Sequence, residues 1–243
     1  MDNEFGSYRF AKIQEYDYSK YFQDKHYKNK TLNEAERRDQ ISMMDNTISQ
    51  FTSDLSLPMD EINESRGKED MWNKINYTLS SSILFVIMTM ADNVVISKYF
   101  LLADKDYDRR VLRGKLMAIN NEGFKKLYGF EEKTKKHSEW AKLQPIMKAF
   151  PSIIQRQYDQ LTALLEEQSQ KDSWWKDERN VETHLDAEGL YRTRNEEIVE
   201  SEVMMNSMRL FNALLAVHLF LKNTYGCIYN FLLGKYYRGE LTK

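Results

Sequence analysis

Residues 179–184, with the sequence Arg-Asn-Val-Glu-Thr-His, bring three chemically useful side chains into one short stretch. Arg179 carries a permanent positive charge on a planar group whose N–H donors match the oxygens of a phosphate. His184 has an imidazole that accepts or donates a proton near neutral pH. Asn180 adds an amide directly beside the arginine. A cation and a proton carrier at this spacing could together cleave a phosphodiester bond of RNA without a metal ion.

The two main groups converge most easily if a helix begins between them. On one continuous helix, residues five apart lie about 140° apart around the axis, so Arg179 and His184 would diverge. Asn180 is a favourable N-cap residue, and Glu182 in the first turn would suit the helix dipole. The free N–H groups of that turn could then hold a phosphate oxygen. A helix that starts several residues upstream and runs straight through would separate the two side chains instead.

The pattern of an arginine, a polar residue and then a histidine, in a chain that we expect to be helical, resembles the HEPN superfamily of helical-bundle proteins. Many members are metal-independent endoribonucleases of toxin, defence and RNA-processing systems. The resemblance rests on Arg179, Asn180, His184 and the fold class. It implies that His184 is a general base on the ribose 2′-hydroxyl or a general acid on the leaving oxygen. Arg179 would neutralise charge at phosphorus, and Asn180 would orient one of these groups or bind the phosphate.

The resemblance also implies partners. One histidine cannot easily serve both proton transfers, so a symmetric homodimer that brings two copies of the motif together is expected on chemical grounds as well. RNA is the implied substrate, and an antitoxin or another defence-system protein is an implied partner. No cofactor and no metal ion is implied, and an inactive relative would keep only the fold. Further contacts to RNA, by base stacking and phosphate pairing, are expected from Tyr191, Arg192 and Arg194.

Structural roles explain the same residues without catalysis. Arg179 could pair with a neighbouring carboxylate, at Asp177, Glu182 or Asp186, in an exposed ion pair worth about 0–1 kcal/mol. His184 could be a surface imidazole, or could bind a metal ion with Asp186, although no third histidine or cysteine supports such a site. The alternative function is therefore a non-enzymatic helical interaction module, whose apolar helix face binds a partner protein.

The composition predicts an all-α protein. Its 243 residues include only 9 glycines and 3 prolines, fewer than a β-rich or loop-rich fold uses. Hydrophobic residues make up 42% and charged residues 30%, which suits long helices with one buried and one solvated face. The net charge is −2, so RNA binding would need a local basic patch. The single cysteine, Cys227, excludes an intramolecular disulfide, and we expect it to be buried.

Apolar periodicity predicts a bundle of about five to seven helices with long antiparallel helices at its core. Residues 1–60 are assigned to an N-terminal arm and helix, and residues 61–243 to the HEPN-like bundle. Within the first part, residues 1–30 are expected to be a loosely docked arm, and Ser56–Pro58 should end the first helix before a polar connector. The helices are expected over about residues 33–55, 68–102, 107–128, 152–169 and 194–224, with a separate short helix over residues 226–237.

Two apolar stretches are explained as buried helices rather than membrane spans. Residues 83–91 are too short, because a span needs about 20 residues. Residues 210–233 are longer but carry polar side chains such as Lys222 and His218, and we expect His218 to be packed rather than to bind a ligand. The N-terminus lacks the apolar stretch of a signal peptide, so we expect a cytoplasmic protein.

Overall fold

A computed structural model of the chain describes residues 13–23, 32–171 and 198–237. Within these ranges the chain forms helices and turns and contains no strand, which confirms the all-α bundle predicted from composition and periodicity. The helices are η1 (a 3-10 helix, Tyr18–Tyr21), α1 (Glu34–Asp54), α2 (Ser56–Ser65), α3 (Met71–Leu102), α4 (Asp106–Leu127), α5 (Glu132–Lys135), α6 (Glu139–Met147), α7 (Ser152–Ser169) and α10 (Glu200–Tyr237).

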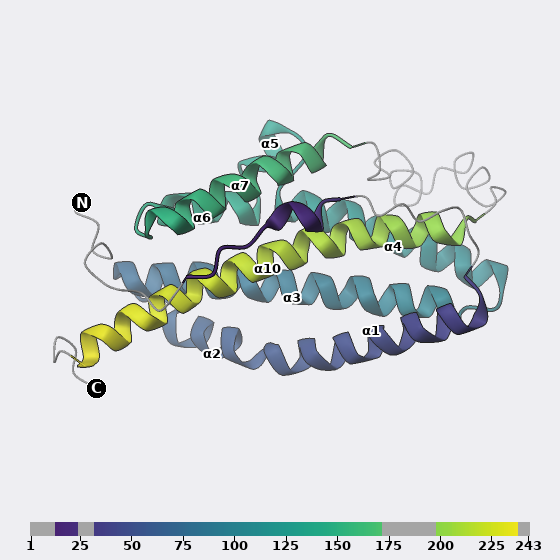
Figure 1. Ribbon diagram of the computed structural model, residues 1–243, viewed down its shortest axis with the longest axis horizontal. Coiled ribbons are helices and arrows are strands. Elements are labelled where there is room, and N and C mark those ends of the chain that lie inside the picture. Colours follow the sequence, from purple (N-terminus) through teal and green to yellow (C-terminus); the bar gives the residue numbers. More distant parts are fainter. Residues whose placement is uncertain (1–12, 24–31, 172–197, 238–243) are drawn as a thin grey trace.

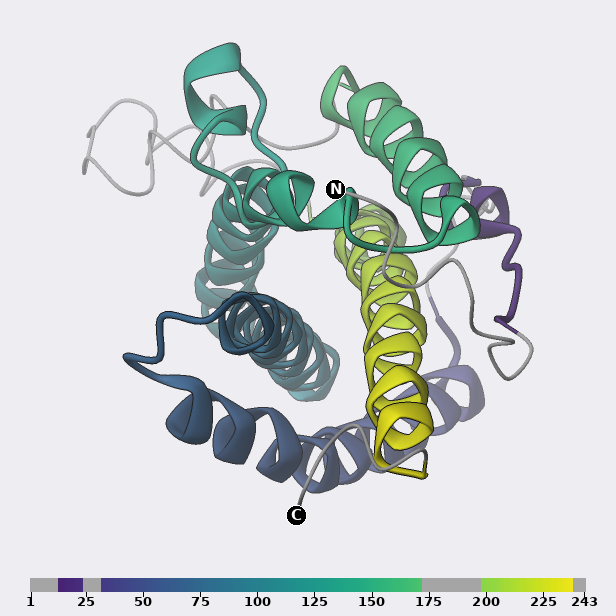
Figure 2. The ribbon, with the colours of Figure 1, turned by 90° about the vertical axis from the view of Figure 1, so that its left-hand side faces the viewer.

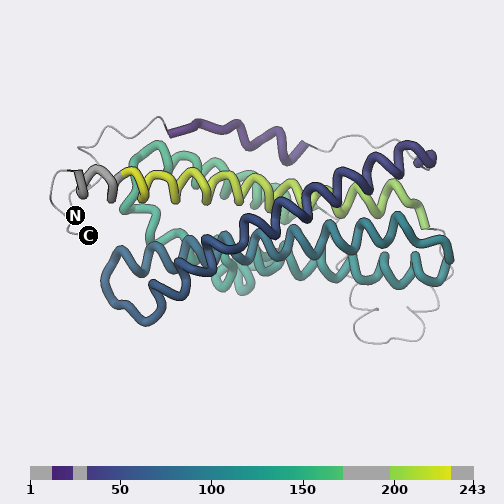
Figure 3. The backbone as a smooth tube through the Cα atoms, turned by 90° about the horizontal axis from the view of Figure 1, so that it is seen from below, coloured from purple at the N-terminus to yellow at the C-terminus, as the bar shows by residue number. Residues whose placement is uncertain are grey.

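The long helices α3 and α10 lie side by side through the middle of the bundle (Figure 1). Both α1 and α10 run in the direction opposite to α3, which gives the antiparallel core that the sequence predicts (Figure 3). Seen from one end, α1 and α2 lie on one side of this pair, while α6 and α7 lie on the other (Figure 2). Every long helix can therefore bury an apolar face against α3 or α10.

Local sequence fixes where several helices begin. The Asn33 side chain accepts hydrogen bonds from the first turn of α1, and the Glu36 carboxylate accepts one from the backbone N–H of Asn33, which completes a capping box. Asp70 caps α3 by accepting from the backbone N–H of Asn73 at 3.0 Å. Pro151 precedes α7, where its missing N–H costs nothing. The starts predicted at about residues 33 and 152 agree closely with the observed ones, whereas α3 begins at Met71 rather than at about residue 68, because Asp70 is its cap.

The core is built from the inward faces of most of these helices. The main apolar cluster contains an aromatic group, in which the rings of Trp140 and Tyr158 stack with centroids 4.6 Å apart and Phe220 packs against both. Cys227 is buried in this cluster, as the sequence predicts. A second apolar cluster lies where α3, α4 and α10 meet, and contains Phe100 and Leu116.

Three local predictions are wrong. The connector predicted after Pro58 is helical, because proline is tolerated in the first turn of a helix, and α2 follows α1 almost directly. The separate C-terminal helix does not exist, since α10 continues without interruption through Gly226 to Tyr237. Part of the N-terminal arm is firmly packed: Tyr18 is 0% exposed, and its hydroxyl donates to Gln157 Oε1 at 2.8 Å.

The predicted division of the chain at residue 60 falls inside α2. On the N-terminal side of that point, Tyr18 and Phe51 both belong to the main apolar cluster. The N-terminal part that the structure describes therefore shares one core with the rest of the bundle.

The two central helices are long and apolar enough to cross a membrane by length and composition alone. However, 50% of the apolar window in α3 and 61% of that in α10 are buried inside the bundle. The core helices of a soluble protein have the same property, so this finding is compatible with a soluble protein. The predicted cytoplasmic location stays a prediction.

Candidate functional site

The residues that the sequence singles out for chemistry lie between α7 and α10, in the segment 172–197, which is outside the described residues. Their roles therefore stay predictions. What the structure does describe is the framework on both sides of that segment: α7 ends at Ser169, and α10 starts at Glu200. The residues concerned are Arg179, Asn180 and His184, predicted to be catalytic, and Tyr191, Arg192 and Arg194, predicted to contact RNA.

A partly buried ion cluster anchors the start of α10. Glu200 is only 7% exposed, and its Oε2 accepts from Arg37 Nη2 of α1 at 2.9 Å and lies 3.7 Å from Arg109 Nη1 at the start of α4. The Nε of Arg109 also donates to the backbone oxygen of Ala103 at 2.7 Å. Three helices are thus tied together at the point where the chain leaves the segment 172–197, and the cluster carries one net positive charge. A carboxylate in the first turn of α10 is favourable for the helix dipole as well.

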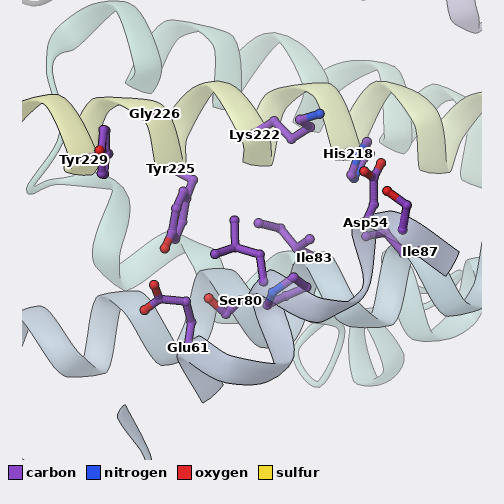
Figure 4. Close-up of a pocket in the computed structure, with 13 residues that line it drawn as sticks. Asp54, Glu61, Ser80, Ile83, Ile87, His218, Lys222, Tyr225, Gly226 and Tyr229 are labelled. Carbon is purple, nitrogen blue, oxygen red and sulfur yellow. The ribbon is translucent and has the colours of Figure 1, made fainter. Parts of the chain in front are cut away.

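A groove of about 470 Å³ lies away from this ion cluster. It is bounded by the C-terminal end of α1 and by side chains of α2, α3 and α10 (Figure 4). Ile83 and Ile87 of α3 line it with apolar surface, and Pro58 contributes from α2. Tyr225 and Tyr229 line it from α10. A groove of this size, mostly apolar with a few polar groups, has the character of a small-molecule site.

His218 occupies one end of the groove. Its side chain lies beside Asp54, it is 7% exposed, and its Nδ1 has no hydrogen-bond partner among the described residues (Figure 4). Burial lowers the pKa of His218 to about 4; the nearby Lys222 acts in the same direction and Asp54 opposes it. The imidazole is therefore uncharged at neutral pH. The expected packing of His218 is confirmed, but the structure adds that this histidine lines a groove.

Ser80 and Tyr225 supply the remaining inner polar groups. Ser80 is 1% exposed, and its Oγ has no hydrogen-bond partner within the described part of the chain. Tyr225 reaches from α10 toward Glu61 on α2 (Figure 4). Burial, and then the hydrogen bond to Glu61, raise the pKa of the Tyr225 hydroxyl, which therefore stays protonated. Glu61 also accepts from Asn76, so its carboxylate is already engaged within the protein.

A second, smaller groove of about 290 Å³ lies between α1, α3 and α10. Its polar base is a buried chain of hydrogen bonds: Asn93 donates to Asn120 at 2.8 Å, Ser207 donates to Asn93 at 2.9 Å, and the hydroxyls of Ser97 and Ser207 are 2.6 Å apart. This network links α3, α4 and α10, although one of its donors, Asn120 Nδ2, has no hydrogen-bond partner among the described residues. Methionines line this groove: Met43, Met44 and Met208 are exposed or partly exposed at its rim, whereas Met204 is buried.

Neither site contains the elements of a metal centre or a reactive thiol. Across residues 13–23, 32–171 and 198–237, no three His, Cys, Asp or Glu side chains gather where they could hold a metal ion. Burial raises the pKa of Cys227 to about 11, so this thiol is not a nucleophile at neutral pH.

Sequence reasoning did not identify either groove. The inner groups of the larger one, Ser80 and His218, are 138 positions apart on different helices, and no spacing in the sequence links them. Comparison of the chain with family models, curated proteins and solved structures finds no match. Function is therefore inferred from the residues themselves.

Proposed function

We propose that the protein is a dimeric, metal-independent endoribonuclease of the HEPN type, or an inactive relative that keeps the fold, in a toxin, defence or RNA-processing setting. The observation that carries this proposal is the sequence Arg179-Asn180 followed by His184, in a chain whose described part is an antiparallel helical bundle. The bundle is the fold that the resemblance implies. The motif supplies the two groups that the reaction needs, a fixed cation and a proton carrier.

The proposed reaction is an attack within the RNA. His184 takes the proton of a ribose 2′-hydroxyl, and the 2′-oxygen forms a bond to the adjacent phosphorus as the bond to the 5′-oxygen breaks. Arg179 neutralises the charge that builds on the phosphate oxygens. A second His184, from the other subunit of the dimer, gives a proton to the leaving 5′-oxygen. The products are a 2′,3′-cyclic phosphate and a 5′-hydroxyl.

The framework around the segment is consistent with such a site. Glu200, Arg37 and Arg109 fix the end of α10 that follows the motif, and catalysis benefits when the groups that act are carried by rigid elements.

RNA cleavage in the presence of EDTA tests the proposal. Wild type should cleave, and His184→Ala should lower the rate about 10²–10⁴-fold, because general acid–base help is lost. His137→Ala is the matched control: His137 is an exposed histidine in the α5–α6 connection, so its loss should leave the rate unchanged. Equal rates for wild type and His184→Ala would remove His184 from the chemistry.

The second candidate function is a non-enzymatic interaction module, and the methionine-rich rim of the smaller groove favours it. Methionine side chains are flexible and polarisable, and they adapt to different apolar partners. Met43 is 69% exposed on this rim. A folded wild-type protein that cleaves none of a varied set of RNAs would favour this second function over the first.

A further inference from the structure

We propose that the groove between α2, α3 and α10 binds a small, largely apolar organic molecule that carries one uncharged hydrogen-bonding group, such as a hydroxyl. This site lies apart from the predicted catalytic motif in the sequence, and the inference does not depend on the ribonuclease proposal. It rests on two unsatisfied polar groups, on the arrangement of charge and on a glycine that keeps the groove open.

The unsatisfied groups are the first reason. Ser80 and His218 are 1% and 7% exposed, and both line the groove. Ser80 Oγ and His218 Nδ1 have no hydrogen-bond partner among the residues that the structure describes. A buried polar atom without a partner is unfavourable, and nearly all such atoms in folded proteins are paired with protein or with ordered water, whose place a ligand can take. A ligand hydroxyl could donate to one of these atoms.

The charges around the groove are the second reason. Asp54 and Lys222, which carry opposite charges, both act on His218, so a charged head group placed there would be attracted by one and repelled by the other. The third charged residue, Glu61, already accepts hydrogen bonds from within the protein. Because burial keeps His218 itself neutral, the two groups without a partner, Ser80 Oγ and His218 Nδ1, offer hydrogen bonds without charge. An uncharged ligand fits this environment better than an ion does.

Gly226 is the third reason. It lies within α10, where glycine is less favourable than alanine, yet the helix continues through it. A Cβ atom built at this position would meet no other atom within 4 Å, so the missing side chain leaves open space in the wall of the groove. The flanking rings of Tyr225 and Tyr229 supply aromatic surface on the same wall. The groove therefore offers aromatic surface and open space to an apolar body.

The probe pair 2-naphthol and naphthalene tests the proposal, because the two differ only by one hydroxyl. Binding to the full chain is followed by saturation-transfer NMR and by fluorescence titration. We expect 2-naphthol to bind with a Kd below about 1 mM, and naphthalene to bind about tenfold more weakly, as the loss of one hydrogen bond predicts. His218→Phe should weaken the binding of 2-naphthol by about tenfold and leave the affinity for naphthalene unchanged.

Blocking variants test the location of the site. Gly226→Phe should fill the open space and abolish the binding of both probes. Gly226→Leu should have the same effect, and leucine also favours helix formation. Asn230→Phe is the matched control, because it adds the same ring to an exposed position four residues further along α10 that does not line the groove. Circular dichroism establishes that each variant is folded.

Four results would overturn the inference: no binding of 2-naphthol to wild type, equal affinities for 2-naphthol and naphthalene, unchanged binding to a folded Gly226→Leu, or tighter binding of the charged analogues 2-naphthoate or 2-naphthylmethylamine. The last result would assign the groove to an ion instead.

Discussion

The buried imidazole of His218 makes the stability of the protein depend on pH in a predictable direction. Its pKa is about 4 in the folded chain, against an ordinary value of 6.5. The unfolded chain therefore binds a proton at this residue more readily than the folded chain does. Stability from this group is fully present above about pH 6.5 and is lost as the pH falls toward 4.

The size of the effect follows from the two pKa values. One pKa unit corresponds to about 1.4 kcal/mol, so the full contribution of His218 is about 3 kcal/mol. About 2 kcal/mol of this should be lost between pH 7 and pH 5. His218 is only 7% exposed, so solvent screening reduces this free energy little. The effects of the nearby charges of Asp54 and Lys222 are already contained in the lowered pKa.

Urea unfolding of wild type and His218→Phe at pH 7 and pH 5 measures this contribution. Carboxylates also contribute to the loss of stability in acid. In Glu166, for example, the hydrogen bond from Lys135 holds the pKa of the carboxyl below its ordinary value, and this stabilising contact is lost when the carboxylate is protonated. Such groups act equally in both proteins, so the difference between the two pH dependences isolates His218. We expect wild type to lose about 2 kcal/mol more than His218→Phe over this range. Equal losses in both proteins would refute the reasoning, since His218 would then titrate normally.

Four further substitutions give predictions of stability that urea or thermal unfolding can check. Gly226→Ala should stabilise the fold by about 0.5–1 kcal/mol, because alanine favours the helix and its Cβ meets open space. Gly123→Ala should be less favourable than Gly226→Ala by at least about 1 kcal/mol, because its Cβ would lie 3.0 Å from side chains of α3 and α10. Equal effects of the two substitutions would contradict the described packing around Gly123. Arg37→Ala should cost about 1–3 kcal/mol by leaving Glu200 with only its longer ion pair, and a neutral result would show that the cluster does not hold α10. Tyr18→Phe should cost about 0.5–1.5 kcal/mol through one lost buried hydrogen bond, and no change would mean that the arm is not docked as described.

Prediction from sequence succeeded where local chemistry decides the structure. The cap at Asn33 and the proline at position 151 indicate helix starts, and apolar periodicity fixes the faces between the ends. It failed where tertiary packing overrides local preference. Gly226 suggests a helix end, but burial of Cys227 and Ile228 against the core keeps α10 continuous.

The groove could not be predicted for a different reason. Its lining comes from α1, α2, α3 and α10, and only the packing of these helices brings Ser80, His218 and Gly226 to one space. Tyr18 was missed as well, because a single tyrosine in a polar arm carries no periodic signal, although it is fully buried against α7 and α10. Spacing along one helix is visible in a sequence, whereas convergence of several helices is not.

Cleavage of a defined RNA in EDTA, compared with the same RNA carrying 2′-deoxyribose at the cleaved position, tests the central claim most directly. If the 2′-oxygen is the nucleophile and His184 moves its proton, wild type cuts the all-ribose strand to a 2′,3′-cyclic phosphate and leaves the substituted strand intact. His184→Ala should cut neither at a comparable rate. Equal cleavage of both strands by wild type, or products with a 5′-phosphate, would contradict the claim.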